Sequence, residues 1–216
     1  SGWTFTNNEY GAALDIRSAY SITVTFTNNT FTANDYGLLI SNVLGGVATQ
    51  NTGVGRPTLN GNTFTTQRLF PILYQGTAEP VFGTGGNLNG FYGNTHTGIA
   101  VGGDLRGSAT WPLVTGKSDS TFPGTPERPV TDPLPYVLYD NDLIVNPGVT
   151  LTLPAGVVVK GHKTVLPNLI PVDYVRHSLT VQGQLVLGAS AGNLAYFTSF
   201  ADDTRGGDTN GDRTIT

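Results

Sequence analysis

The sequence of 216 residues contains no cysteine and no methionine, and only 12% of its residues are charged. Without cysteine, a disulfide scaffold is excluded, and the lack of both easily oxidised side chains fits an extracellular setting. The charged fraction is about half of the roughly 25% that is usual in globular chains. The 11 lysine and arginine residues form no cluster, and the net charge is −4, which argues against a nucleic-acid partner.

Long apolar runs and helical periodicity are also lacking. No run of about 18 apolar residues is present, so the sequence contains no membrane-spanning helix. No stretch of about ten residues shows the period of an amphipathic helix, so we expect little or no helix. The chain begins directly on repeat-like sequence without a signal peptide. We therefore expect it to be a mature or excised segment of a longer secreted protein.

Glycine, of which there are 29 residues, is abundant instead, together with threonine and asparagine. Residues 24–42, VTFTNNTFTANDYGLLISN, show how these residues are arranged, because short runs of Thr, Phe, Val and Leu are separated by Asn, Asp and Gly. Such runs are typical of short strands joined by tight turns. Three strands in about twenty residues describe one turn of a solenoid. The sequence therefore predicts an all-β fold, a parallel β-helix (β-solenoid) with loop insertions.

Related pieces recur along the first half of the chain. If Asn8, Asn29, Asn62 and Asn94 are equivalent, the repeats are spaced by 21, 33 and 32 residues, as in solenoid proteins. The longer steps imply loop insertions, for example around residues 45–51. A repeated asparagine at an inward corner predicts a ladder of stacked side-chain amides. Alternatively, asparagine stands there because it tolerates the left-handed backbone of a turn.

Composition divides the chain into a β-helix repeat block (1–103), a Pro/Ser/Thr-rich linker or loop (104–135), and a second β-helix block (136–216). The second block ends in an acidic Asp/Asn corner. Within it, residues 140–142 look like a turn, and residues 161–178 are expected to bulge out as a loop. Strand alternation predicts inward-facing apolar residues and outward-facing threonines. In the repeat block the expected inward residues are Phe5, Phe26, Phe31, Leu39, Phe64, Leu73 and Ile99.

Three motifs of the second block occur in the same order in a known group of proteins. They are LTLPAGVVVK at residues 151–160, LTVQGQL at 179–185, and FTS at 197–199 followed by DDTRGGDTNGD at 202–212. In this order they resemble the bacterial right-handed parallel β-helix repeat proteins, which are long extracellular, adhesin-like surface proteins. The resemblance implies a secreted or cell-surface location and further coils after the acidic corner. Arg213 departs from the pattern of the group, which commonly has glycine there.

The acidic corner is the strongest candidate for a site. Carboxylates this close repel one another unless a cation or solvent screens them. Hard oxygen atoms at alternating positions suit calcium, although Arg213 stands where an EF-hand loop has glycine. We therefore expect a one-loop structural calcium site, and the alternative is a solvated acidic loop. The expected ligands are Asp202, Asp203, Asp208, Asn210 and Asp212.

Histidines and aromatic residues are weaker candidates. The chain's three histidines, His96, His162 and His177, are scattered and lack partners at metal-ligand or general-base spacing. We interpret His162 and His177 as exposed loop residues, and His96 as an ordinary corner or surface residue. A sugar-stacking strip of aromatic side chains is a further hypothesis, although such side chains are more often buried. Its members would be Trp3, Tyr10, Tyr36, Tyr74, Tyr92 and Trp111.

Threonine pairs of the form Thr-x-Thr recur along the strands, for example at residues 4–6, 30–32 and 63–65. Flat arrays of this kind on β-solenoids resemble the surfaces of ice-binding proteins. Threonine also favours exposed strand positions for its β-propensity alone. The uneven length of the repeats argues against a regular array.

These observations favour a structural or adhesive role over catalysis, so we expect no enzymatic activity. A β-helix is a rigid spacer whose open ends invite pairing with further coils of the parent chain or with copies of itself. The alternatives are a carbohydrate-binding module, with glycans as partners, and a polysaccharide lyase or hydrolase of the β-helix class. Such an enzyme needs acids and a base on adjacent coils. The acids of the repeat block are spread apart: Glu9, Asp15, Asp35 and Glu79.

Overall fold

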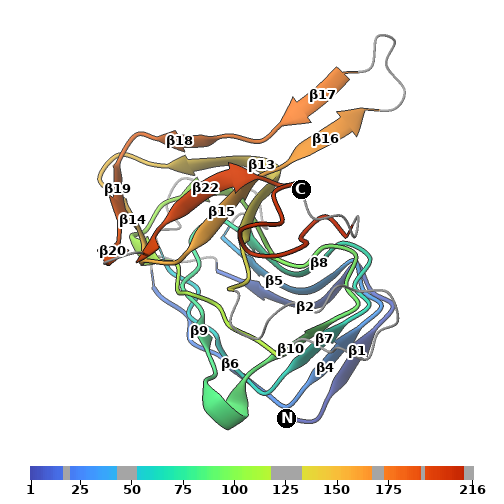
Figure 1. Cartoon of the computed structure of the whole chain (residues 1–216). Coiled ribbons are helices and arrows are strands. Elements are labelled where there is room, and N and C mark those ends of the chain that lie inside the picture. Colours follow the sequence, from blue (N-terminus) through green and yellow to red (C-terminus); the bar gives the residue numbers. More distant parts are fainter. Residues whose placement is uncertain (17–19, 43–52, 118–132, 167–172, 191–192, 212–216) are drawn as a thin grey trace.

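The computed structural model describes residues 1–16, 20–42, 53–117, 133–166, 173–190 and 193–211, and these ranges form an all-β parallel β-helix (Figure 1). Strands that lie one coil apart pair side by side in parallel. The predicted fold class is therefore confirmed. Within these ranges the only helical element is a short 3-10 turn, η1 (Gly85–Asn87). None of the described residues belongs to a helix that is long and apolar enough to span a membrane.

Two sheets run along the length of the stack. The Thr sheet has the order β1 (Thr4–Thr6), β4 (Thr30–Thr32), β7 (Thr63–Thr65) and β10 (Gly90–Tyr92). The long sheet continues through every coil (Figure 1). Its order is β2 (Tyr10–Asp15), β5 (Tyr36–Ser41), β8 (Phe70–Gln75), β11 (Ile99–Leu105), β13 (Tyr136–Val145), β15 (Val158–Gly161) and β22 (Tyr196–Ser199), with β18 (Leu179–Val181) also paired to β13.

Smaller sheets and two hairpins complete the walls. The first small sheet contains β3 (Thr25–Thr27), β6 (Thr58–Asn60) and β9 (Val81–Phe82), and the second contains β12 (Ala109–Thr110), β14 (Thr150–Leu153) and β19 (Gln184–Leu187). The antiparallel hairpins are β16 (Lys163–Leu166) with β17 (Asp173–Arg176), and β20 (Ala189–Ser190) with β21 (Asn193–Leu194). The hairpin β16–β17 lies within residues 161–178, which the sequence predicts to bulge out, and Figure 1 shows it projecting from the stack.

Coil length varies along the Thr sheet, yet its strands stay in register. Thr4 pairs with Thr30, Thr30 with Thr63, and Thr63 with Gly90. The corresponding steps along the chain are 26, 33 and 27 residues. The extra residues of the longer coil therefore lie outside the paired strands. The insertion expected around residues 45–51 lies outside the described residues.

Two amide ladders flank the strands of the Thr sheet. At each ladder position, a backbone N–H of one coil donates a hydrogen bond to the side-chain amide oxygen of the Asn or Gln in the next coil, at 2.9–3.1 Å. The predicted ladder is therefore confirmed, and the adjacent Asn7 and Asn28 also adopt the left-handed backbone, with φ of 58° and 54°. The first amide ladder, before the strands, consists of Asn29, Asn62 and Asn89. The second amide ladder, after the strands, consists of Asn8, Asn34, Gln67 and Asn94.

The predicted equivalence of four asparagines is wrong in part. Asn29 and Asn62 occupy equivalent places in the first amide ladder, whereas Asn8 and Asn94 belong to the second. The spacing of 21, 33 and 32 residues mixes two different corners of the coil. The second amide ladder is difficult to recognise in the sequence, because Gln67 takes the place that asparagine has in the other coils.

The main core is the interior of the coils, and its central feature is a stack of phenylalanine rings. Ring centroids of Phe5, Phe31, Phe64 and Phe91 are 4.9, 4.7 and 5.4 Å apart in turn. Burial of one aromatic ring in each coil contributes roughly 2–3 kcal/mol by area. The predicted inward residues Phe31, Phe64 and Ile99 are buried in this core, and Phe5 and Phe26 pack against it.

Leu39 and Leu73 face the other way, so their predicted inward orientation is wrong. They are buried in a second cluster on the opposite face of the long sheet, with Tyr36 and Phe70. Their neighbours Leu38 and Ile72 belong to the main core. Strands of a parallel sheet that is covered on both faces have apolar residues at consecutive positions. The alternation that identifies the inward face is therefore lost in β5 and β8.

The long sheet continues across the segment between the two predicted blocks. β11 pairs with β13, although residues 118–132 between them lie outside the described residues. The division into 1–103, 104–135 and 136–216 stays a prediction. The turn predicted at residues 140–142 is instead part of β13, where the pairing with β11 shifts register between Val101 and Gly103. Asn141 and its neighbours form this bulge, so two predicted strands are one.

Candidate functional site

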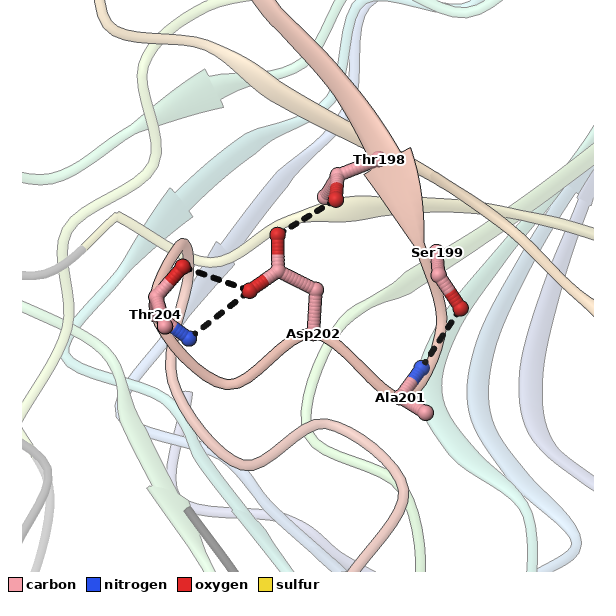
Figure 2. Close-up of a pocket in the computed structure, with 5 residues that line it drawn as sticks. All are labelled: Thr198, Ser199, Ala201, Asp202 and Thr204. Atoms are coloured by element: carbon pink, nitrogen blue, oxygen red, sulfur yellow. Dashed lines mark hydrogen bonds between the residues drawn. The ribbon is translucent and has the colours of Figure 1, made fainter. Parts of the chain in front are cut away.

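The acidic corner follows β22 and is described as far as Gly211, so Asp212 lies outside the described residues. Figure 2 shows Asp202 between Thr198 of β22 and Thr204 of the corner. One carboxylate oxygen accepts a hydrogen bond from the Thr198 hydroxyl, and the other accepts from the Thr204 amide at 3.0 Å and hydroxyl at 2.6 Å. These hydrogen bonds lower the pKa of Asp202, and the bond from the Thr198 hydroxyl has the largest effect, ahead of that from the Thr204 hydroxyl. Asp202 therefore organises its own turn as an anion.

Asp203, Asp208 and Asn210 take different positions in the same corner. Asp208 accepts a hydrogen bond from the Gly211 amide at 2.7 Å, which closes a second local turn. The carboxylate oxygens of Asp203 are shielded from solvent. Asn210 is partly buried. The structure therefore brings the four described candidates into one loop, and two of their side chains hold its turns.

Lys160 supplies a cation to the base of this loop. Its side chain, at the end of β15, is fully buried, and its Nζ atom donates to the carbonyl oxygens of Asp202 at 2.7 Å and Gly207 at 2.9 Å. A buried ammonium that bonds loop carbonyls orders the chain around it much as a bound metal ion does. The sequence alone does not predict this role. The available signal was a lysine that directly follows the apolar run 157–159.

The loop is also fixed to the body of the stack. Thr209 is buried, and its carbonyl accepts a hydrogen bond from the Thr97 amide at 3.1 Å. Gly211 has a φ of 72°, and a β-carbon there would lie only 2.8 Å from the carbonyl oxygen of Thr95. The acidic corner therefore lies across the residues that follow β10, and the close approach at Gly211 requires glycine.

A metal ion in this corner would share its ligands with the protein. Among residues 1–211 that the structure describes, no three His, Cys, Asp or Glu side chains are placed to hold a metal. Both oxygens of Asp202 and one of Asp208 already accept hydrogen bonds. Asp212, the fifth expected ligand, lies outside the described residues. Calcium binding by Asp202, Asp203, Asp208, Asn210 and Asp212 thus stays a prediction.

A shallow depression opens on the outer side of the corner. It is lined by Thr198, Ser199, Ala201, Asp202 and Thr204, which Figure 2 shows as sticks. Their hydroxyl groups and one carboxylate offer hydrogen bonds to a polar ligand, without an aromatic platform among the lining residues. The depression is open to solvent, so it favours weak surface contacts over the enclosure of a substrate.

The six aromatic residues of the hypothetical sugar-binding strip do not share a surface. Tyr74 and Trp111 are fully buried in the main core, where Trp111 stacks on Tyr136 with centroids 4.7 Å apart. Tyr36 is buried on the other face of the long sheet. Trp3 is 68% exposed at the first coil. A continuous strip of all six is therefore wrong.

The three histidines come together, so their interpretation as scattered residues is wrong. The His162 ring centroid lies 6.4 Å from that of His96 and 6.5 Å from that of His177. The same ring contacts Tyr139 at 4.8 Å and Phe200 at 4.6 Å. This histidine cluster joins the corner after β10, the base of the hairpin β16–β17, and β13. Such long-range contacts leave no spacing signal in the sequence.

Comparison with known proteins gives no family assignment. Neither the protein-family models, nor the curated proteins, nor the solved structures contain a match to this chain.

Proposed function

We propose that the chain is a structural segment of a secreted or cell-surface bacterial protein, in which a rigid stack of β-helix coils acts as a spacer or adhesive element. The observation that carries this proposal is the long sheet, which passes from β2 to β22 through every coil. Repeat proteins of this kind are stabilised mainly by contacts between adjacent repeats, so such a stack can be extended coil by coil. The resemblance of the second block to right-handed bacterial β-helix repeat proteins supports the bacterial surface location.

The partners in this proposal are further coils of the parent chain or copies of the chain itself. Among the described strands, β2 and β22 end the long sheet, and a strand at the edge of a sheet is a template for pairing with a further strand. Several apolar side chains near β22 are exposed, which favours burial against another coil. They are Val181, Val186, Leu187, Leu194 and Phe197. The depression beside Asp202 supports glycans as a weaker candidate partner.

Sedimentation velocity at rising protein concentration tests the structural role. We expect species larger than the monomer to accumulate, and we expect Phe197→Asp, at an exposed position of β22, to reduce them several-fold. Val81→Asp is the control, because Val81 is also exposed but lies in β9. A chain that stays monomeric at every concentration contradicts self-association. Release of products from acidic or neutral polysaccharides would instead support the lyase or hydrolase alternative.

Calcium is proposed as a structural ion of the acidic corner, and a thermal melt tests it. In the presence of EDTA we expect a lower Tm than with saturating calcium, because an ion that binds only the folded state stabilises it by mass action. The increase should saturate and should disappear in Asp208→Ala/Asp212→Ala. Magnesium at the same concentration serves as the control, since it accepts fewer protein ligands. An unchanged Tm means that Lys160 and the local turns hold the corner without a metal.

A second candidate function, binding to ice, is favoured by the register of the Thr sheet. Thr4, Thr30 and Thr63 form one column, and residues 6, 32 and 65, also threonines, form a second. Threonines within one column are about 4.8 Å apart, which is the distance between neighbouring strands. The two columns are about 6.8 Å apart, which is the length of two residues along a strand. The uneven repeats do not disturb this array, contrary to the expectation from the sequence. The phenylalanine stack lies beneath this array, and the two amide ladders flank its strands.

Inhibition of ice recrystallisation tests this second candidate. We expect the wild-type chain to slow crystal growth several-fold, and Thr30→Tyr to remove the effect, because a large ring in the central strand breaks the flat surface. Thr58→Tyr changes the same residue type in a different sheet, on β6, and should keep the activity. Equal crystal growth with and without the wild-type chain excludes ice binding.

A further inference from the structure

The hairpin β16–β17 is attached to the coil stack at its base. Its two strands pair only with each other among the described residues. The residues next to the base, Gly161 and Leu179, pair with Ser199 and Leu143 of the long sheet. Between these pairs and the hairpin lie His162 and His177, where the His177 amide approaches the His162 carbonyl at 3.5 Å. The histidine side chains therefore occupy the point where the hairpin leaves the stack.

Aromatic rings from the body of the protein surround these two histidines. Tyr139 lies 4.8 Å from His162 and 6.3 Å from His177, measured between ring centroids. Phe200 contacts both His162 and His96, at 4.6 and 5.3 Å. Such ring contacts suit a neutral imidazole, because burial among apolar rings disfavours a charge. The packing of the hairpin on the stack thus depends on uncharged histidines.

Charged side chains of both signs lie near the cluster. Asp142 of β13 is the described carboxylate whose charge acts on His177, and it already accepts a hydrogen bond from the Ser178 amide at 2.7 Å. Lys163 and Arg176 pair across the base of the hairpin and add positive charge there. The Nδ1 atom of His96 is shielded from solvent and has no hydrogen-bond partner among the described residues. Protonated rings in this cluster therefore repel one another.

We propose that the histidine cluster is an acid-sensitive lock, which holds the hairpin β16–β17 on the coil stack and releases it when the imidazoles are protonated. Release exposes the faces of Tyr139 and Phe200 that the histidine rings cover. The lock is independent of the self-association and calcium proposals, because it uses neither the terminal strands nor the acidic side chains of the corner.

The pH range follows from the two histidines whose titration is shifted. Burial, followed by the positive charges of His96 and His177, lowers the pKa of His162 to about 4, and burial lowers the pKa of His96. In an opened hairpin both groups return toward their ordinary value of about 6.5. The open form therefore binds more protons between about pH 6.5 and 4. The lock is fully closed above this range and is progressively weakened as the pH falls through it.

Hydrogen exchange of the hairpin amides, corrected for intrinsic rates, tests the lock in the whole chain. Between pH 7 and pH 4.5 we expect protection in 163–166 and 173–176 to fall at least about tenfold, since one pKa unit is a tenfold change in equilibrium. Protection in the Thr sheet should hardly change. His162→Phe keeps an aromatic ring that takes no proton, so its hairpin should stay protected at pH 4.5. Equal loss in the variant and the wild type overturns the proposal.

A second measurement keeps the proposal testable if His162→Phe folds poorly. Titration of the three imidazoles of the wild-type chain by NMR should show a midpoint for His162 well below 6.5, and a coupled shift of His96. Asp142→Asn removes the carboxylate that offsets a proton on His177 and accepts the Ser178 amide, so hairpin release should move to higher pH. A midpoint of about 6.5 for His162, with the hairpin still protected below it, overturns the lock.

Discussion

Replacing Asn62 with alanine should lower the free energy of unfolding by roughly 3–5 kcal/mol, since each buried polar group left unsatisfied costs about 1–3 kcal/mol. The Asn62 side chain is fully buried in the middle of the first amide ladder. Its oxygen accepts from the amide and the side chain of Asn29, at 3.0 and 3.1 Å. Its nitrogen donates to the Phe26 carbonyl at 2.9 Å and to Asn89 at 3.1 Å. Alanine removes all four bonds and leaves Phe26 and Asn29 without this partner.

Chemical denaturation measures this loss, as a fall in the midpoint at an unchanged slope. Asn8→Ala is the matched control, because Asn8 lies at the exposed end of the second amide ladder. Its side chain donates to Asn34 at 3.3 Å and to the Thr6 carbonyl at 2.9 Å. We expect less than about 1 kcal/mol there, since water can replace these bonds. Similar losses at both positions would show that burial in the ladder is unimportant.

Replacing Lys160 with methionine should detach the acidic corner from the stack. Methionine fills a similar volume but donates no hydrogen bond, so the carbonyl oxygens of Asp202 and Gly207 lose the ammonium that bonds them. A hydrogen bond from a charged group is worth about 1.5–3 kcal/mol, and a buried carbonyl left unsatisfied costs about 1–3 kcal/mol. The corner can reach solvent by opening, so we expect a global loss of roughly 2–3 kcal/mol. Limited proteolysis should then cut within residues 201–211.

Lys163→Met provides the comparison for Lys160. Lys163 begins β16, is exposed, and should tolerate the same change with little effect on stability or proteolysis. If calcium restores the protease resistance of Lys160→Met, the ion and the ammonium order the same loop. If Lys160→Met is cut no faster than Lys163→Met, the buried ammonium is not what holds the acidic corner.

The fold was predictable from the sequence because local and global preferences agree in the strands. TFT occurs four times, in β1, β3, β4 and β7, and each copy is extended with its phenylalanine in or against the main core. Which asparagines are equivalent from coil to coil was harder to predict, because asparagine occurs at both corners that flank the strands of the Thr sheet. Gln67 and the mixed spacing of Asn8 and Asn29 conceal the two ladders. Only the pairing of the strands separates them.

The sites were predictable only where their residues are neighbours in the chain. The acidic corner is visible in the sequence because its residues lie in a single loop. Its cation, Lys160, comes from a strand of the preceding coil. The histidine cluster is assembled by coils that stack His96 against His162. A single sequence contains no record of such stacking, because contacts between coils depend on the lengths of the intervening loops.

The second amide ladder also gives the stack a direction of assembly. The Asn8 amide donates to the side chain of Asn34, and the Asn34 side chain donates back to the Phe5 carbonyl. Gln67 makes the same two bonds to the coil of Asn34, with the Asn34 amide and the Phe31 carbonyl. Each coil is therefore completed by the one that follows it in the chain. During synthesis on the ribosome, each new coil supplies the hydrogen bonds that the previous coil needs. The chain can therefore fold coil by coil from its N-terminal end.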